Sequence, residues 1–287
     1  MRYHTGLREG MQLFAPAKIN LSLKILRRRE GGFHEIDTLM TPISLHDELT
    51  IEPNESGTGI AFSCDDQTVP LGEENLVVRA ARRFFSEIEA EPKVRITLQK
   101  KIPQGAGLGG GSSDAASTLR GLNELHGAPL SFVRLTTIAA EIGSDVPFFL
   151  ASSAARCRGR GENVEPVANL PKLALLLLKP DFGVATASAY RDWVNSCELA
   201  GVDYAPLKLG NLVLENDLER PVFEKHFFLA LMKSWLRQQP EVAAALLSGS
   251  GSTIFAVLRE ANLARSLAER AKRELDPELW SCSCETI

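Results

Sequence analysis

The fold of this chain is decided by a glycine-rich stretch near its middle, Pro103-Gln104-Gly105-Ala106-Gly107-Leu108-Gly109-Gly110-Gly111-Ser112-Ser113-Asp114. Five glycines leave much of the stretch without Cβ atoms, so the backbone can take positive φ and approach a ligand. The flanking residues predict a strand just before it, at 94–98, and a helix just after it, at 114–126. Free N–H groups and the positive end of a helix dipole would then meet at one place, which favours an anion. The stretch is therefore predicted to bind phosphate rather than to act as a flexible linker.

Two common phosphate-binding loops do not fit this stretch. A Walker A loop needs a lysine after its second glycine, and Gly111 occupies that position. The dinucleotide fingerprint G-x-G-x-x-G matches Gly105, Gly107 and Gly110, but it also needs a second strand with an acidic residue about 20 positions later. Here a helical pattern continues instead, through Leu119, Leu122 and Leu125. The loop is therefore expected to belong to another class.

The composition is typical of a soluble globular protein, with 44% hydrophobic and 24% charged residues among 287. This length allows one large domain or two ordinary domains with a sizeable core. The net charge of −4 gives no reason to expect nucleic acid or an anionic membrane as a partner. The longest apolar run, Leu173 to Leu178, is too short to cross a bilayer. We therefore expect neither nucleic acid nor membrane among the partners.

The cysteines and the N-terminus bear on the compartment. The five cysteines are scattered, and Cys282-x-Cys284 has neither a second pair nor nearby histidines. This spacing does not predict a zinc site, and reduced thiols in the cytoplasm fit it better. The first ten residues are polar and lack the apolar core of a signal peptide. A cytoplasmic location is therefore expected.

Further strands and helices are predicted in an irregular order. Polar and apolar residues alternate from Lys18 to Ile25, which predicts a strand whose polar face carries Lys18, Asn20, Ser22 and Lys24. Asn75 can cap a helix that has apolar residues at helical spacing. Other strands are expected at 33–39, 49–52, 59–63, 173–178 and 253–258, and other helices at 131–142, 186–195, 222–237 and 260–274. Without strict alternation of strands and helices, this order favours an α+β fold, which we divide into domains of residues 1–158 and 159–287.

Three segments together resemble the motifs of the GHMP kinase superfamily, namely Pro16–Leu21, Pro103–Ser113 and Leu247–Phe255. The resemblance runs in order from about residue 14 to residue 258. It implies an N-terminal domain like ribosomal protein S5 and a ferredoxin-like C-terminal domain, with ligands in the cleft between them. It also implies that ATP is the phosphoryl donor and that Mg²⁺ accompanies it.

Details within the superfamily resemble one branch of small-molecule kinases. They are Pro16–Leu21, Gly32-Phe33-His34, Asn75-Leu76-Val77, Gly109–Asp114 and Gly143-Ser144-Asp145-Val146-Pro147-Phe148. This branch phosphorylates the 2-hydroxyl of a methylerythritol linked to cytidine diphosphate, in the non-mevalonate route to isoprenoids. The expected partner is therefore a small molecule, and the protein is expected to be a monomer or a weak homodimer.

The resemblance assigns the catalytic and ATP-binding residues. Asp145 would take the proton of the acceptor hydroxyl or hold that hydroxyl in line, and Lys18 would pair with it. The residues of the loop from Pro103 to Ser113 would bind the ATP phosphates, and Asn75 and Lys100 (or Lys101) would lie near the adenosine. The alternatives are a structural cap for Asn75 and an exposed charge for the lysine. Ser113 is a candidate Mg²⁺ ligand, with a plain helix cap as the alternative. For Lys18 the alternative is a solvated strand lysine, and for Asp145 it is a helix-terminal cap.

The resemblance also assigns the residues that bind the acceptor substrate. Phe33 and Tyr190 match two positions that stack on the cytosine, although Phe33 replaces an expected tyrosine, and His34 matches the residue that reads the base. Asn20 and Thr186 would bind polar groups of the substrate. The diphosphate would be met by backbone donors of the C-terminal turn, at Gly249, Ser250 and Gly251. The alternatives are core packing for Phe33 and Tyr190, a satisfied surface histidine for His34 and a simple strand-entry turn for the C-terminal turn. The segment 216–219 is expected to have a structural role.

Three other functions remain to be weighed. One is a kinase of the same superfamily that acts on mevalonate, homoserine or a sugar. Another is a nucleotide-binding sensor without catalysis, which the presence of both Lys18 and Asp145 disfavours. The third is a dinucleotide oxidoreductase, which lacks the second strand that it needs.

Overall fold

A computed structural model describes residues 10–28, 33–55, 57–151 and 153–287. The chain forms two compact units that each combine separate segments. Unit 1 contains 1–17, 46–102 and 109–152, and unit 2 contains 18–45, 103–108 and 153–287. The predicted domains, 1–158 and 159–287, divide the chain at one point only, and this division remains a proposal. Gly31-Gly32, which the sequence favours as a turn between the strands at 18–25 and 33–39, and the first nine residues lie outside the described part.

The strands of unit 1 follow the predicted alternation but are longer than expected. β1 (Met11–Arg28) and β2 (His34–Pro53) are long strands that each contribute to both units. In unit 1 β4 (Lys93–Gln99) pairs antiparallel with β2, with Ile96 opposite Ile51, and parallel with β3 (Gly59–Cys64). The sequence predicted two short strands, at 33–39 and 49–52, where β2 is continuous. Pro42 lies inside this strand, so proline did not end it.

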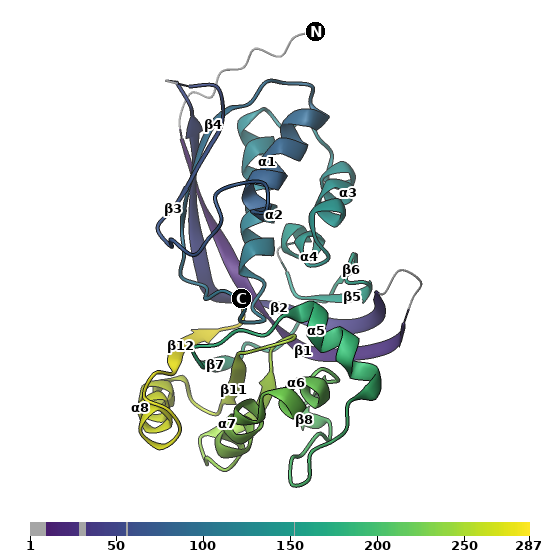
Figure 1. Ribbon diagram of the computed structural model, residues 1–287, viewed down its shortest axis with the longest axis vertical. Coiled ribbons are helices and arrows are strands. Elements are labelled where there is room, and N and C mark those ends of the chain that lie inside the picture. Colours follow the sequence, from purple (N-terminus) through teal and green to yellow (C-terminus); the bar gives the residue numbers. More distant parts are fainter. Residues whose placement is uncertain (1–9, 29–32, 56, 152) are drawn as a thin grey trace. The chain divides into compact units, whose positions relative to one another are not determined.

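The described part of unit 1 also contains the helices labelled in Figure 1 as α1 (Leu76–Glu87), α2 (Gly110–Leu125), α3 (Phe132–Ile142) and α4 (Val146–Ala151). Asn75 caps α1 as predicted, since its side chain accepts a hydrogen bond from the backbone N–H of Val77 at 2.8 Å. At Gly121, α2 approaches the strands so closely that a Cβ atom would lie 2.4 Å from Leu13 Cδ1. The short helix α4, directly after Asp145, was not predicted.

Unit 2 contains a four-stranded antiparallel sheet with the order β10-β11-β7-β12. Its strands are β7 (Ala174–Lys179), β10 (Val242–Leu247), β11 (Ile254–Leu258) and β12 (Trp280–Glu285). Between β7 and β10 come α5 (Thr186–Asp192), α6 (Glu219–Lys225) and α7 (Phe227–Arg237), and α8 (Ala264–Glu274) precedes β12. This βαββαβ order confirms the expected ferredoxin-like arrangement. One helix predicted at 222–237 is in fact α6 and α7, with His226 between them.

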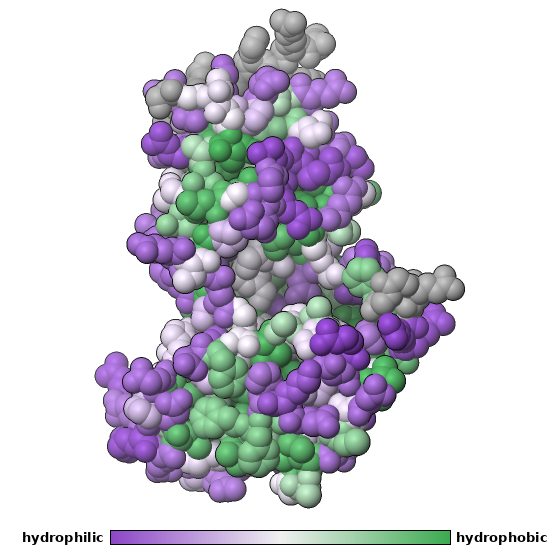
Figure 2. Space-filling model, viewed as in Figure 1, coloured by the Kyte–Doolittle hydropathy of each residue, from purple (hydrophilic) through white to green (hydrophobic). Residues whose placement is uncertain are grey.

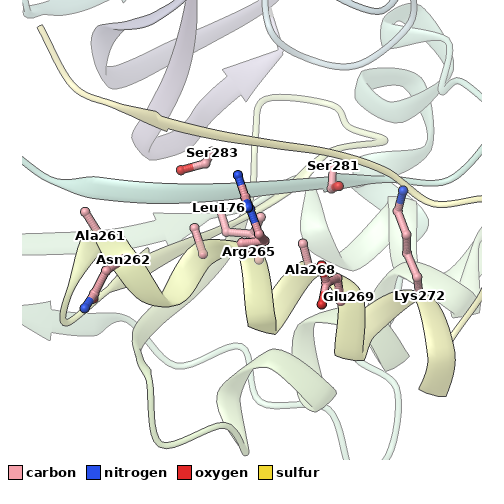
Figure 3. Close-up of a pocket in the computed structure, with 10 residues that line it drawn as sticks. Leu176, Ala261, Asn262, Arg265, Ala268, Glu269, Lys272, Ser281 and Ser283 are labelled. Carbon is pink, nitrogen blue, oxygen red and sulfur yellow. The ribbon is translucent and has the colours of Figure 1, made fainter.

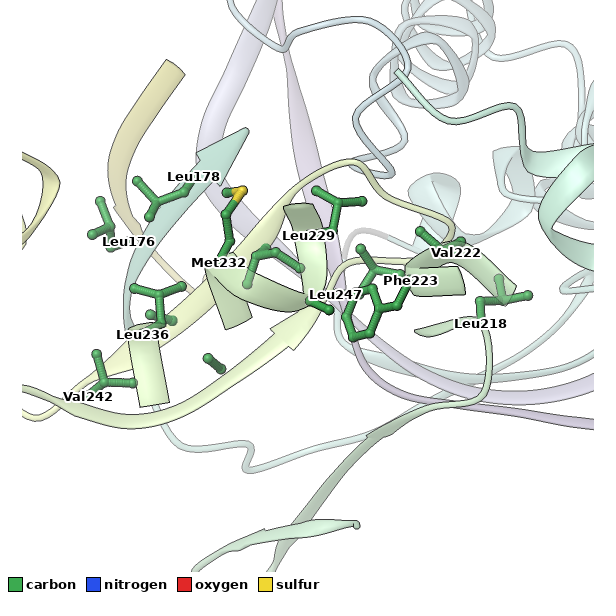
Figure 4. Close-up of a cluster of buried hydrophobic side chains, with 14 of the residues drawn as sticks. Leu176, Leu178, Leu218, Val222, Phe223, Leu229, Met232, Leu236, Val242 and Leu247 are labelled. Carbon is green, nitrogen blue, oxygen red and sulfur yellow. The ribbon is translucent and has the colours of Figure 1, made fainter. Parts of the chain in front are cut away.

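One face of this sheet is covered by helices and forms the core of unit 2. Figure 4 shows the cluster, to which β7 contributes Leu176 and Leu178 and α7 contributes Leu229, Met232 and Leu236. The outward face of α8 is hydrophilic in Figure 2, as expected for a helix that buries only Ala264, Leu267 and Ala271. Burial of these apolar side chains is the main term that stabilises unit 2.

Shorter strands, none of them predicted, complete unit 2. The part of β1 after Lys18 pairs parallel with β9 (Leu212–Asn216), which forms a hairpin with β8 (Leu207–Leu209). The first part of β2 pairs with β5 (Ala155–Gly159), and β5 pairs with β6 (Asn163–Pro166). Within the described residues, no helix is both long and apolar enough to span a membrane.

Candidate active site

The glycine-rich loop runs from unit 2 into unit 1 after Leu108. In unit 1 its second half begins α2, with Gly109 at the helix cap in the left-handed region at φ 72°. The helix therefore begins at Gly110, four residues earlier than predicted, and Ser113 lies inside its first turn. The alternative that Ser113 is a plain helix cap is wrong. Its hydroxyl is fully buried and has no hydrogen-bond partner among the described residues.

A buried charge network lies beside the start of α2. Lys100 Nζ is hydrogen-bonded to carboxylate oxygens of Asp47 and, at 2.9 Å, of Asp114. A Cβ atom on Gly110 would lie 3.2 Å from Lys100 Nζ, so the network touches the helix start. Lys100 was predicted to bind ATP, with an exposed charge as the alternative. Because its side chain is only 8% exposed, that alternative is wrong.

The remaining contacts of this network tie it to the end of β4. Asp47 Oδ1 also accepts hydrogen bonds from the backbone N–H groups of Lys101, at 2.5 Å, and Ile102, at 2.8 Å. The sequence contained a signal for Asp47 that was missed. It lies two residues before Leu49 and four before Ile51, on the buried side of β2.

Burial raises the pKa of Asp114 to about 7, although Lys100 opposes this shift. Burial alone would lower the pKa of Lys100, but the carboxylates of Asp114 and Asp47 outweigh it, so that pKa is raised. One lysine faces two carboxyl groups, and Asp114 Oδ1 lacks a partner in the part of the chain that the structure describes. The network is therefore close to neutral when Asp114 is protonated and negative when it is ionised.

Asp114→Asn is expected to stabilise the protein above neutral pH. Because the folded-state pKa of Asp114 lies above its ordinary value of 3.8, the folded state binds the proton more tightly from about pH 4 to pH 7. The free energy of unfolding therefore falls as the pH rises through this window. Asparagine removes the ionisation, so the Tm of the variant should exceed that of the wild type by about 2–4 °C at pH 8. Thermal unfolding at pH 5 and pH 8 measures this.

The control for this prediction is Asp181→Asn, since Asp181 is exposed. Its Tm should follow that of the wild type at both pH values. At pH 5 the Asp114→Asn variant should unfold close to the wild-type temperature, because the native carboxyl group is then protonated. A variant less stable than the wild type at pH 8 would contradict the assignment.

In unit 2 the first half of the loop is locked to the turn between β10 and β11. The backbone N–H groups of Ser252 and Thr253 donate to the carbonyl oxygens of Gly105 and Ala106, each at 3.2 Å. Ser248 Oγ donates to Gly107 O at 3.0 Å. The two glycine motifs that the sequence singled out, Pro103–Ser113 and Leu247–Phe255, are thus in direct contact. Sequence reasoning placed this turn against the substrate diphosphate and did not predict its bonds to the loop.

Lys18 lies on β1 directly beside this junction. Its backbone N–H donates to Leu108 O at 2.9 Å, and its Nζ donates to Asn20 Oδ1 at 2.6 Å. Lys18 is 4% exposed, so the alternative of a solvated strand lysine is wrong. Asn20 Nδ2 in turn donates to Thr38 Oγ1 at 2.8 Å, and this hydroxyl donates to Ser22 O. Thr38 was not predicted as a site residue, because the sequence does not show which residue of the strand at 33–39 lies opposite Asn20.

Aromatic side chains gather around His34 in unit 2. Its ring stacks on Tyr190 with 5.6 Å between centroids, and the Trp193 ring lies nearly at right angles to it with 6.0 Å between centroids. His34 is 6% exposed, and neither ring nitrogen finds a hydrogen-bond partner among the residues that the structure describes. Burial and then the charge of Arg28 lower its pKa, so the imidazole is neutral at pH 7. A neutral ring offers one donor and one acceptor, and the surface-histidine alternative is wrong.

The structure also shows the surroundings of the predicted substrate residues Thr186, Ser250, Phe33 and Tyr190. Thr186 Oγ1 and Ser250 Oγ lie 2.8 Å apart, which brings those two predicted residues together. Phe33 is 51% exposed and lies under the guanidinium of Arg160, 4.9 Å from the ring centroid. Core packing is therefore wrong for Phe33. Tyr190 is partly buried and packs against the core of unit 2, as the core-packing alternative expects, and its stacking on cytosine stays a prediction.

Two predicted residues of unit 1, Asn75 and Asp145, each lie directly before a helix. Both ends of the Asn75 amide are used, since Oδ1 caps α1 and Nδ2 donates to Pro70 O at 2.8 Å. Asp145 is partly buried and lies in the turn directly before α4. The roles assigned to both residues stay predictions.

A pocket of about 380 Å³ lies elsewhere in unit 2, between α8 and β12 (Figure 3). Its polar lining includes Arg265, Lys272, Ser281 and Ser283, and none of the predicted site residues. In the described ranges, no three His, Cys, Asp or Glu side chains gather in a way that could hold a metal ion.

Comparison with known proteins agrees with this fold and these motifs. The family model for the GHMP kinases N terminal domain matches residues 75–153, and that for the GHMP kinases C terminal domain matches 205–276. A 4-diphosphocytidyl-2-C-methyl-D-erythritol kinase from Methylacidiphilum infernorum is 40% identical over 271 residues, covering 93% of each chain. The chain therefore belongs to the GHMP kinases and, within them, to the family of 4-diphosphocytidyl-2-C-methyl-D-erythritol kinases.

Solved structures support the same conclusion. A crystal structure of 4-(cytidine 5'-diphospho)-2C-methyl-D-erythritol kinase has a TM-score of 0.77 and 35% identity, over 96% of this chain and 99% of the other. Homoserine kinase from Cytophaga hutchinsonii has a TM-score of 0.63 at 18% identity, covering 100% of this chain and 97% of that one. At that identity the likeness shows the fold alone. The protein is an ATP-dependent kinase, and the alternatives of an oxidoreductase and of a sensor without catalysis are wrong.

Proposed function

We propose that this protein transfers the γ-phosphoryl group of ATP to the 2-hydroxyl of 4-diphosphocytidyl-2-C-methyl-D-erythritol, in the non-mevalonate route to isoprenoid precursors. The relatives that carry this substrate in their names are similar over most of the chain. The observation that carries the proposal is the buried, neutral His34, stacked on Tyr190 with both ring nitrogens free of partners in the described structure. A base edge that needs one donor and one acceptor fits this ring.

The nucleotide end is supported by the loop and by α2. Phosphoryl transfer needs mainly positioning and charge stabilisation. Backbone N–H groups at the start of α2 and the helix dipole attract the ATP phosphates. Gly109 in the left-handed region and Gly110 in the first turn keep side chains out of this place.

Mg²⁺ fits the residues at the start of α2. Magnesium keeps several waters and takes few protein ligands together with substrate phosphates, so a large cluster of carboxylates is not required. The buried Ser113 hydroxyl, which has no partner in the described ranges, is the oxygen that would hold it. When bound, the ion would neutralise charge on the phosphates.

The chemical step is assigned to Lys18 and Asp145. Lys18 carries an amine that is buried and oriented by Asn20, so its charge is fixed rather than solvated. Such a preorganised charge stabilises the negative charge that develops during transfer. Asp145 would accept the proton of the 2-hydroxyl or align that hydroxyl for attack.

The cytidine end of the substrate is assigned to unit 2. Tyr190 and His34 would hold the base, and the exposed ring of Phe33 would supply a further stacking surface. Thr186 and Ser250 share a hydrogen bond and offer hydroxyl groups to the diphosphate, together with backbone donors at Gly249 and Gly251. Trp193, which sequence reasoning missed, would limit the space beside His34.

A substrate panel tests the proposed function. ADP release is measured with ATP and, in separate reactions, the cytidylyl substrate, mevalonate and homoserine. Because a site built for the hydrogen bonds of a base rejects substrates that lack them, kcat/KM should be about 10³-fold or more higher with the cytidylyl substrate. Similar values for mevalonate or homoserine would assign the protein to another branch of the superfamily.

We further infer that the enzyme works in the cytoplasm, without nucleic acid or membrane, as a monomer or weak homodimer. The five free cysteines support the compartment, and the net charge of −4 supports the absence of nucleic acid and anionic membranes, whereas the oligomeric state rests on the family resemblance alone.

A further inference from the structure

The end of strand β10 is held by two side chains from one short segment of unit 2. β10 lies at the edge of its sheet, so its outer peptide groups are not bonded to another strand of that sheet. At Leu247 the backbone N–H donates to Glu219 Oε1 at 3.0 Å, and the carbonyl oxygen accepts from Asn216 Nδ2 at 2.8 Å. Leu247 itself belongs to the same core cluster of unit 2 as Leu218 and Phe223 (Figure 4). The segment 216–219 therefore fixes the place where β10 ends.

Asn216 also holds the turn that follows β10. Its Nδ2 donates a second hydrogen bond, to Gly249 O at 2.7 Å, and its Oδ1 accepts one from the N–H of Leu218 at 2.9 Å. The side chain is buried, with 7% exposure. Two carbonyl oxygens need donors and one N–H needs an acceptor, so an amide satisfies all three groups and a carboxylate does not.

A buried ion pair anchors the segment from below. Glu219 Oε2 lies 2.5 Å from Lys233 Nζ on α7, and both side chains are 3% exposed or less. Lys233 Nζ also donates to Asp203 O at 2.9 Å. Burial raises the pKa of Glu219, and the charge of Lys233 opposes this shift. Such a pair stabilises one arrangement, because moving either partner alone would leave a buried charge uncompensated.

The turn held by Asn216 reaches the groups assigned to catalysis. A Cβ atom on Gly249 would lie 3.2 Å from both Lys18 Nζ and Asn20 Oδ1, so this turn packs directly against the amine. The next contact is made by Ser248 Oγ, which donates to Gly107 O in the glycine-rich loop. A shift of the turn would therefore move both the phosphate-binding backbone and the lysine.

We propose that Asn216 is a positioning residue for phosphoryl transfer. Its amide ties the end of β10 to the carbonyl of Gly249 and thereby sets where Lys18 and the loop at 105–107 lie. This inference rests on the proposed function, since it takes Lys18 and the loop as parts of the reacting site. It replaces the purely structural role that the sequence suggested for 216–219.

The test compares Asn216→Ala with Leu236→Ala. Leu236 lies in the same core on α7, away from the turn, and its truncation lowers the Tm through lost packing. Steady-state kinetics are measured well below both unfolding temperatures, and amide hydrogen exchange is measured at 248–253. Asn216→Ala should lower kcat about 30-fold and speed exchange at these amides, because a misplaced group costs up to about 10²-fold. Leu236→Ala should keep kcat within about twofold even where it loses more stability.

Two further variants keep the test decisive. Asn216→Asp keeps the acceptor for Leu218 but loses both donated bonds, so it should match Asn216→Ala. Ser248→Ala removes only the hydroxyl bound to Gly107 and should raise the KM for ATP about threefold to tenfold. It tests the contact between the turn and the loop even if the Asn216 variants do not fold. Wild-type kcat and unchanged exchange at 248–253 in the Asn216 variants, or an equal loss of kcat in Leu236→Ala, would overturn the inference. If instead the wild type phosphorylates nothing in the substrate panel, the proposed function fails, and exchange at 248–253 alone tests the link to the turn.

Discussion

Lys18→Met is expected to lower kcat by about 10³-fold and to leave the protein folded. Methionine fills a similar volume but removes a buried positive charge that Asn20 orients at 2.6 Å. It also leaves Asn20 Oδ1 without that donor, which lowers the Tm by a few degrees. Stopped-time assays of ADP formation give kcat, and circular dichroism confirms the fold.

The matched control for this variant is Lys24→Met on the same strand. Lys24 is 53% exposed and pairs with Glu215 at 3.1 Å, a surface interaction of little energetic value. It should keep kcat within about twofold. A Lys18→Met enzyme that retained a tenth or more of the wild-type kcat would remove Lys18 from the chemical step.

Gly107→Ala is expected to unlock the loop from the β10–β11 turn. Gly107 has φ of 72°, and a Cβ atom there would lie 2.0 Å from Ser248 O and 2.9 Å from Gly251 N. Both are backbone atoms, so the loop or the turn must move. We expect a loss of about 3 kcal/mol or more in the free energy of unfolding and a rise of at least about tenfold in the KM for ATP. Denaturant unfolding and ATP titrations of the initial rate measure the two effects.

Gly201→Ala is the control that separates the strain of a positive φ from the steric clash of an added Cβ atom. Gly201 has a similar φ of 80°, but nothing lies within 4 Å of the position that its Cβ would take. It should lose only about 1 kcal/mol and keep the KM for ATP. If Gly107→Ala and Gly201→Ala changed the free energy of unfolding and the KM for ATP equally, the close approach of Gly107 to Ser248 would not explain the effects at Gly107.

Much of the loop could be predicted because its signals are local. Glycines that need positive φ, a strand before them and a helix after them are all visible in neighbouring residues. The structure confirms positive φ at Gly105, Gly107 and Gly109. The start of α2 was misplaced by four residues, because Gly110 and Gly111 read as loop although they lie in the helix.

Several strands gave no usable pattern. β10 reads Val-Ala-Ala-Ala-Leu-Leu, which has no alternation and is rich in a helix-favouring residue. β12 reads Trp-Ser-Cys-Ser-Cys-Glu and lies at an edge, where one-sided burial is incomplete. In both strands pairing with distant segments decides the structure, and a single sequence does not show such pairing.

The polar contacts of the site were hidden for a related reason. Asp47 is 53 residues from Lys100, and Asn216 is 33 residues from Gly249. Each side chain acquires its role only through a hydrogen-bond partner that the fold brings next to it. Lys18 and His34 could be named from the resemblance, but their burial and their partners could not.

The interleaved make-up of unit 2 also has a consequence for how the chain matures during synthesis. Unit 1 contains no residue beyond 152. The pairing of β1, in contrast, is complete only when β9 has been made, since Ser22 pairs with Glu215 and the Ile25 N–H bonds to Asp217. As translation proceeds from the N-terminus, the segment 18–45 leaves the ribosome long before β9, the parallel partner of β1, has been made. Until then its apolar residues, such as Leu21, Leu23 and Ile25, are available to chaperones. The native pairing of β1 is therefore completed only after residues 215–217 have been synthesised.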